Sequence, residues 1–477
     1  MANNKVTKIL GYGALAVVVV GGGAFLVLSH SKPGLPGEVG SAAALVSQGE
    51  YVARVADCGS CHTAINGKVY AGGLQIKSPI GAIYSSNITP DKEHGIGNYS
   101  LADFDRAVRQ GVRKDGASLY PAMPYPSFAR LSDQDITALY AYFMHGVDAD
   151  ASADKPEDIP WPLSMRWPLA MWRGLFGPEP ANAAKSVVAA DPIVARGEYL
   201  VTGPGHCGAC HTPRGPALQE RALDNRSPAF LAGGTVIDGW IVPSLRGEED
   251  VGLGRWSVDD IATFLKTGRT NHAAVFGGMA DVVAWSTQYA SDADLHAVGA
   301  YLKTLQPGTP GSARFVADNA TAKLLDAGQT QGNHGAEVYQ QQCAICHQND
   351  GGGVARMFPP LAGNPVVTSA NPVSVLHVVA LGGALPPSNT APSSVAMPGF
   401  AERLSERDLA DVVNYIRTSW GNHAPANATA DMVKPWRRVQ AEARGVDTSG
   451  WELAAPQPYG SGWSFAPQSH DGHDNPQ

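Results

Sequence analysis

The chain has few charged residues and no excess of basic ones. Charged side chains make up 16% of its 477 residues, and 43 acidic against 35 basic residues give a formal net charge of −8. Nucleic-acid binding needs a basic surface that neutralises phosphates, so this composition excludes nucleic acid as a partner. The chain is also longer than a single hydrophobic core normally supports, so several domains are expected.

The chain also lacks the patterns of most catalytic sites. It has no nucleotide-binding glycine loop, no nucleophile elbow and no separate cluster of metal ligands. Cysteine is scarce: there are six, and all of them belong to one repeated motif. A disulfide framework would place cysteines at irregular spacings, so this arrangement argues against one.

The repeated motif is C-x-x-C-H, at residues 58–62, 207–211 and 343–347. It is the attachment motif of c-type haem, in which both thiols bond to the porphyrin and the adjacent histidine ligates the iron. A structural zinc site would need four converging ligands, whereas these copies lie well over a hundred residues apart. We therefore predict three covalent haems. Their thioethers come from Cys58, Cys61, Cys207, Cys210, Cys343 and Cys346, and one axial ligand of each comes from His62, His211 and His347.

Two further phrases recur around each motif. G-E-Y-V at 49–52, G-E-Y-L at 197–200 and the looser A-E-V-Y at 336–339 each predict a helix that ends at the haem motif. After each motif, S-x-x-D at 132, 291 and 405 precedes an apolar pattern typical of a capped helix with one buried face. The pattern predicts a mainly α-helical chain with three tandem domains of the class I cytochrome c type.

The second axial ligand of each haem is expected to be a methionine. Met123, Met279 and Met397 each lie in a Gly/Pro-containing stretch before a closing helix, where we expect a loop. A thioether on a stiff loop suits haem iron and raises its reduction potential, although methionine also serves as core filler. Met279 differs from the others because no proline follows it and His272 lies nearby. Irons with both axial positions filled are restricted to one-electron transfer.

The N-terminus has the pattern of a membrane anchor. Lys5 and Lys8 precede an uncharged run at 9–28, which would span about 30 Å as a helix. No small-residue cleavage site follows directly, so we expect one uncleaved transmembrane helix, with a cleaved signal peptide as the alternative. The lysines place the N-terminus in the cytoplasm and everything after the helix outside.

A linker and a tail flank the predicted domains. Residues 161–176 combine three tryptophans and two arginines with apolar residues, which suits a membrane interface, a partner subunit or packing against the chain's own domains. Residues after Trp420 are rich in Pro, Gly and Trp, which favours an extended tail. The predicted divisions are a membrane anchor at 1–33, cytochrome c domains at 34–150, 191–310 and 311–420, a Trp/Pro-rich linker at 151–190 and the tail at 421–477.

Longer stretches of the chain resemble a known family. A-G-G-L at 71–74, P-I-G-A-I-Y-S-S-N-I-T-P-D at 79–91, Y-P-A-M-P-Y-P at 120–126 and the segment 159–176 are similar to the triheme cytochrome c subunit of bacterial membrane-bound dehydrogenases. These complexes oxidise gluconate and other sugars, alcohols or aldehydes in the periplasm. The resemblance covers about residues 48 to 420. The two ends of the chain differ from much of the family, because many members have a cleaved signal peptide and C-terminal amphipathic anchors.

The resemblance implies an electron-transfer subunit that is not itself catalytic. Electrons would pass from a catalytic dehydrogenase subunit of the flavin, quinone-cofactor or molybdenum type, through the haems, to ubiquinone in the bacterial inner membrane. A small third subunit is compatible with this arrangement, and the haem domains would face the periplasm. The alternative is a multihaem peroxidase-like enzyme with one labile axial ligand, for which Met279 is the candidate. A relay that feeds a terminal oxidase would call for a second metal site or more membrane spans.

Overall fold

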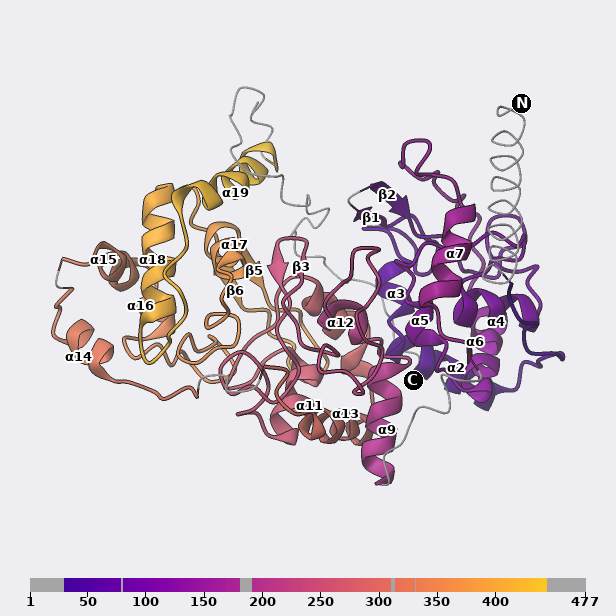
Figure 1. The fold of residues 1–477 in the computed structure, drawn as a ribbon, viewed down its shortest axis with the longest axis horizontal. Coiled ribbons are helices and arrows are strands. Elements are labelled where there is room, and N and C mark those ends of the chain that lie inside the picture. Colours follow the sequence, from indigo (N-terminus) through magenta and orange to yellow (C-terminus); the bar gives the residue numbers. More distant parts are fainter. Residues whose placement is uncertain (1–29, 79, 181–190, 310–313, 331, 444–477) are drawn as a thin grey trace, which may run out of the picture. The chain divides into compact units, whose positions relative to one another are not determined.

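Each haem motif follows a helix that crosses the closing helix of the same repeat. The structure is a computed structural model that describes residues 30–78, 80–180, 191–309, 314–330 and 332–443. Within these ranges the chain is mainly helical, with three two-stranded antiparallel hairpins (Figure 1). The expected mainly helical fold class is confirmed.

The elements follow the predicted order. In the first repeat and the linker they are α2 (Ala43–Val55), α3 (Cys58–Cys61), β1 (Gln75–Ser78), β2 (Gly81–Tyr84), α4 (Leu101–Gln110), α5 (Tyr125–Phe128), α6 (Asp133–His145) and α7 (Trp167–Phe176). In the second repeat they are α9 (Pro192–Thr202), α10 (Gly208–His211), β3 (Val236–Ile237), β4 (Trp240–Ile241), α11 (Val258–Thr267), α12 (Gly278–Trp285), η2 (Thr287–Tyr289) and α13 (Asp292–Thr304). The last elements are α14 (Ala320–Asp326), α15 (His334–Gln342), α16 (Ala344–His347), α17 (Val373–Leu381), β5 (Gly382–Ala384), β6 (Ala396–Pro398), α18 (Glu406–Thr418) and α19 (Ala430–Ala443).

The chain divides into two compact units. The first unit contains residues 1–231 and 285–304, and the second contains residues 232–284 and 305–477. Residues of the predicted second domain, 191–310, therefore fall in both units. The helix pairs α2–α6 and α9–α13 belong to the first unit, and the pair α15–α18 belongs to the second.

A glycine lies at each of these three helix crossings. A Cβ placed on it would meet a backbone carbonyl oxygen of the partner helix: 1.9 Å for Gly49 and Ala138, 1.9 Å for Gly197 and Ala297, and 2.3 Å for Gly335 and Asp411. A real Cβ cannot approach an oxygen this closely, so only glycine allows the helices to cross at this distance. The third glycine directly precedes the A-E-V-Y phrase, so the looser third repeat keeps the same crossing.

Two tyrosines join the first repeat to the second. The Tyr51 hydroxyl on α2 donates to Asp294 on α13, with 2.6 Å between the oxygens, and the Tyr199 hydroxyl on α9 donates to Asp135 on α6. Each hydroxyl also accepts from the N–H of the serine before the partner's closing helix, at 3.1 and 3.2 Å. The contacts are reciprocal, so each G-E-Y phrase binds the S-x-x-D phrase of the other repeat. The third repeat has Glu337 at the equivalent position.

The expectation of an extended tail is wrong for residues 430–443. These residues form α19, which packs against α17 and α18 and buries Val433 and Trp436. The two apolar residues are three positions apart, so they share one face of the helix. The Pro- and Gly-rich composition of the wider tail obscured this short pattern. Residues 444–477 lie outside the described ranges.

No helix within the described ranges is long and apolar enough to cross a membrane. The predicted transmembrane run at 9–28 lies outside those ranges. The anchor therefore stays a prediction from the sequence.

The glycine crossings lead to a test of the helix packing. Gly197→Ala should destabilise the folded protein by about 1–3 kcal/mol, because the new methyl group must push α9 away from α13. The measurement is thermal unfolding of the haem-loaded protein, followed by far-UV circular dichroism. Gly40→Ala is the control, because a Cβ at Gly40 meets nothing within 4 Å. Equal Tm values for the two variants would contradict the packing argument.

Candidate haem-binding sites

The first haem motif forms a single helical turn. Cys58 and Cys61 begin and end α3, and the N–H of His62 donates to the carbonyl of Cys58 at 3.0 Å. Residues three apart on a helix lie on the same face, so both thiols can reach one porphyrin edge. Asp57 precedes the turn in the left-handed conformation, with φ 53°, and redirects the chain from α2 into α3.

Two motif histidines are held in the orientation that an iron ligand needs. Nδ1 of His62 lies 2.7 Å from the carbonyl oxygen of Ser86, and Nδ1 of His347 lies 3.0 Å from that of Pro359. A carbonyl oxygen only accepts, so Nδ1 carries the proton and Nε2 keeps its lone pair for a metal. Burial also lowers the pKa of both imidazoles, which favours their neutral, ligating form.

Three of the motif thiols do not have the environment of a reactive dithiol. Burial raises the pKa of Cys58, Cys207 and Cys343 to about 12, whereas redox-active cysteines are thiolates of lowered pKa. Within the described ranges, no group of three or more His, Cys, Asp or Glu side chains is placed to hold a metal ion. The described residues therefore indicate neither a redox dithiol nor a converging set of metal ligands at these thiols.

The first site brings Met123 and the haem motif to one hydrophobic cluster. Met123 and Cys58 both pack against a cluster that includes Tyr70, Phe104 and Phe143. Met123 lies in the turn before α5, and its N–H donates to Tyr120 at 3.2 Å. The loop setting expected for this methionine is confirmed, and its role as an axial ligand stays a prediction.

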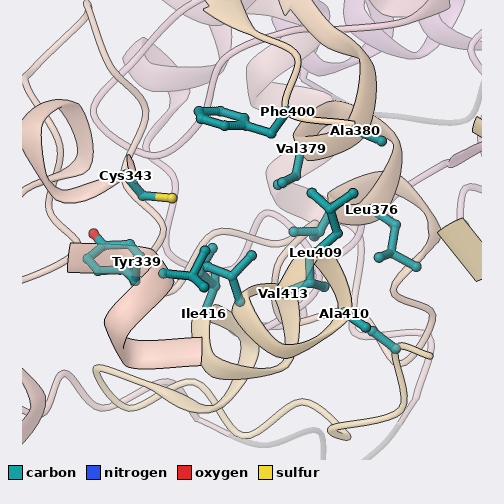
Figure 2. Packing of buried hydrophobic residues seen from close by; sticks show 14 of the residues in the cluster. Tyr339, Cys343, Leu376, Val379, Ala380, Phe400, Leu409, Ala410, Val413 and Ile416 are labelled. Carbon is teal, nitrogen blue, oxygen red and sulfur yellow. The ribbon is translucent and has the colours of Figure 1, made fainter. Parts of the chain in front are cut away.

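The third site is built in the same way. Figure 2 shows the Sγ of Cys343 pointing toward the middle of a hydrophobic cluster, with Phe400 on one side and Ile416 on the other. Met397 packs against the same cluster. It lies on strand β6, where it pairs with Gly383 of β5, so the expected loop is instead a short hairpin. The hairpin holds the Met397 backbone by cross-strand pairing.

The second site differs most from expectation. Met279 is the second residue of helix α12 rather than part of a loop, and it packs against Val275 and Val283. Unlike the other two methionines, Met279 is not followed by proline. Met279 belongs to the second unit and His211 to the first, so their pairing at one iron stays a prediction.

The segments that precede the first and second haem motifs contact each other within the first unit. His206 directly precedes Cys207, and its Nε2 lies 3.3 Å from the carbonyl oxygen of Ala56, two residues before Cys58. The His206 ring also packs edge-on against Phe128, with 5.5 Å between ring centroids. Sequence reasoning did not identify His206, because nothing in its local pattern shows which distant residue it will contact.

A buried aromatic stack lies beside the third site. The ring of His377 on α17 stacks between Trp240 and Trp436, at centroid distances of 3.8 and 4.1 Å. Nδ1 of His377 lies 3.3 Å from the carbonyl of Gly239, while Nε2 has no hydrogen-bond partner among the described residues. Burial lowers the pKa of His377 to about 4. The imidazole is therefore neutral at pH 7, like the indoles that enclose it.

Comparisons with known proteins find one matching family model and several similar proteins. A family model for cytochrome c matches residues 46–146 and 333–420. The cytochrome c subunit of alcohol dehydrogenase (quinone) from Gluconacetobacter polyoxogenes is 61% identical over 439 residues, which cover 91% of this chain and 94% of that protein. The gluconate 2-dehydrogenase cytochrome c subunit of Pantoea cypripedii is 50% identical, covering 85% and 92%. The fructose dehydrogenase cytochrome subunit of Gluconobacter japonicus is 37% identical, covering 86% and 85%.

The axial methionines can be tested one at a time. Met123→Ala and Met397→Ala should each remove part of the sulfur-to-iron charge-transfer absorption and lower the potential of one haem, because a thioether ligand raises that potential. Visible spectra combined with a redox titration provide the measurement. Met357→Ala is the control in the third repeat, where Met357 is 48% exposed. A spectrum that is unchanged in either variant would remove that methionine from the ligand set.

His377 predicts a pH dependence of stability. Its folded pKa lies below the ordinary value of 6.5, so protonation favours the unfolded chain. Above pH 6.5 the neutral ring makes its full contribution to the free energy of unfolding. As the pH falls toward 4, about 3 kcal/mol of that free energy is lost. The measurement is urea unfolding at several pH values in this range, followed by circular dichroism. The free energy of unfolding should change less steeply with pH in His377→Phe than in the wild-type protein. His423→Phe, at an exposed histidine, should keep the wild-type slope. Identical slopes in both variants would contradict the prediction.

Proposed function

Because this chain belongs to the family of cytochrome c subunits of dehydrogenase complexes, we propose that it carries electrons from a catalytic alcohol dehydrogenase subunit, through three c-type haems, to ubiquinone. Electron transfer within a dehydrogenase complex follows from the family itself. The choice of partner rests on identity, which is higher to the alcohol dehydrogenase subunit than to the gluconate and fructose dehydrogenase subunits. The quinone acceptor rests on the name of that relative and on the resemblance seen in the sequence.

The contact between the first two haem motifs is the observation that carries the proposal. Haem c supplies reversible one-electron chemistry when bound. The chain joins the residues just before the two attachment turns through His206 and the carbonyl of Ala56. Haems attached at these two motifs would be held by neighbouring segments of one unit, so an electron could pass between them without a mobile carrier.

Three haems are favoured by the repeated architecture. The helix crossing at a glycine occurs at all three motifs, although the family model for cytochrome c matches only the first and third. Gly197 and Tyr199 give the second repeat the same crossing and the same tyrosine as the first. We therefore assign a cytochrome c domain to each motif, one haem to each domain, and both axial positions of each haem to the chain.

The membrane location is part of the same proposal. The uncharged run at 9–28 would anchor the chain in the inner membrane, with the haem domains on the periplasmic side. Attachment of c-type haem outside the cytoplasm and reduction of a membrane-soluble quinone both fit this location. The catalytic subunit would bind on the periplasmic side.

Co-purification tests the partner. With this chain as bait in detergent-solubilised membranes, we expect a stoichiometric catalytic subunit of the quinone-cofactor alcohol dehydrogenase type, identified by mass spectrometry. The isolated complex should reduce a ubiquinone analogue when alcohol is added, and the chain alone should not. If a flavin or molybdenum dehydrogenase co-purified instead, the alcohol dehydrogenase partner would be wrong, and the electron-transfer role of this chain would still hold.

Carbon monoxide distinguishes the relay from a peroxidase-like enzyme. Reduced haems with histidine and methionine on both faces should bind almost no carbon monoxide, because no axial position is open. The haem content of the chain, measured as pyridine haemochrome, should correspond to one haem per motif. A large carbon monoxide difference spectrum from the intact complex would support the enzyme and contradict the relay.

A further inference from the structure

We propose that the segment around helix α7 lies in the interfacial layer of the membrane, with its exposed apolar side chains facing lipid. This proposal rests on the membrane anchor proposed above. Four side chains form this surface, called the α7 surface below: Trp161, Leu163, Trp167 and Leu175, with exposed fractions of 79, 51, 55 and 60%. Large apolar groups with this much exposure, gathered on one short segment, indicate a surface that is covered in use.

The polarity of this segment is inverted relative to a helix that faces water. Its two arginines turn toward the protein: Arg173 is only 8% exposed, and Arg166 pairs with Glu157 and lies 4.2 Å above the ring of Tyr120. The apolar Trp167 and Leu175 point outward instead. A surface helix of a water-soluble domain normally shows the opposite arrangement.

The inner side of α7 is fixed to the first unit. Trp172 donates its indole N–H to the carbonyl of Ala217 at 2.8 Å and packs edge-on against Tyr125, with 6.0 Å between centroids. The Arg166 guanidinium donates to the carbonyl of Ser118 at 3.2 Å. Trp167 and Leu175 therefore lie on a helix whose other side holds it in place.

The medium that covers the α7 surface is inferred to be lipid, because α7 is bonded to the residues that directly follow the uncharged run. The carbonyl of His30 accepts from Arg173 of α7 at 3.4 Å, and Lys32 pairs with Glu179, just beyond α7, at 2.7 Å. The uncharged run ends at Leu28, and two residues of chain span at most about 7 Å. Wherever that run enters the bilayer, only these two residues and the hydrogen-bonded side chain of Arg173 separate the entry point from α7.

Further hydrogen bonds fix the residues that follow the uncharged run to the first unit. The N–H of Lys32 donates to Gln110 at 2.9 Å, and the N–H of Leu35 donates to Asp105 at 2.9 Å. An anchored chain cannot turn its attachment point away from the membrane surface, so the α7 surface meets the headgroup region. Tryptophan is the side chain most typical of that region, because its ring is apolar and its N–H is polar.

Spin labels on the full-length, haem-loaded chain test the proposal. All six cysteines lie in haem motifs, so one introduced cysteine is the only thiol free to react. Trp167→Cys and Leu175→Cys are labelled with a nitroxide and reconstituted, without the catalytic subunit, into vesicles of phosphatidylethanolamine and phosphatidylglycerol. Electron paramagnetic resonance then measures collisions of the label with oxygen, which concentrates in lipid, and with a water-soluble nickel chelate.

The matched control is Ile193→Cys, because Ile193 is 59% exposed on α9, a helix of the same unit that Figure 1 draws well apart from α7. We expect collisions with nickel to be several-fold fewer at both α7 positions than at the control, and collisions with oxygen to be more frequent. Equal access of nickel to all three labels would overturn the proposal. Shielding of the α7 labels from both reagents would mean that protein covers the surface, and would also overturn it.

Carbonate extraction separates this proposal from the anchor on which it rests. A chain that stays in the vesicles at alkaline pH, but carries nickel-accessible labels on α7, would keep the anchor and refute the interfacial helix. A chain that is extracted by carbonate would refute the anchor itself. Because the labelled side chains are exposed in the folded unit, failure to fold is not expected of either variant, and the haem spectrum checks this directly.

Discussion

The close crossing of two helices at a glycine is the contact on which the rest of each repeat depends. The first helix delivers the haem motif, the closing helix supplies the apolar wall, and their separation determines where the motif begins. A backbone carbonyl lies where a Cβ would be on Gly49, Gly197 and Gly335. The same crossing therefore holds the motif at a similar position in all three repeats, although their loops differ.

The three repeats are not equivalent, because an exchange of tyrosines joins only the first two. Tyr51 and Tyr199 each bind an aspartate in the first turn of the other repeat's closing helix. Asp294 is also held by a bidentate pair of hydrogen bonds from Arg196, at 2.8 and 2.7 Å. Charge-assisted, partly buried bonds of this kind fix orientation as well as proximity. The exchange therefore sets how the first two haem motifs meet, and Glu337 replaces the tyrosine in the third repeat.

Local patterns in the sequence were enough to predict the helix before each haem motif and the start of each closing helix. Ser132 and Ser405 accept from the backbone N–H three residues later, as the S-x-x-D phrases indicate. The motif spacing likewise predicted the ligating turns. The settings of Met279 and Met397 were missed, because a short helix or hairpin in a Gly/Pro-rich stretch depends on tertiary contacts rather than on local propensity. For the same reason, no local signal identified His206 or the stack around His377.

The segment around α7 shows where composition alone stops being informative. Tryptophans, arginines and apolar residues within one linker are compatible with a membrane, a partner subunit or the protein's own core. The structure separates these cases by showing which groups turn inward. Arg173 is buried and bonded to the backbone at His30, while Trp167 faces outward. The two arginines of this segment turn inward and Trp167 and Leu175 stay exposed, although Trp172 packs against the unit. With the proposed anchor, lipid is the apolar medium that would cover the exposed pair, because the bond from Arg173 to His30 ties α7 to the end of the uncharged run.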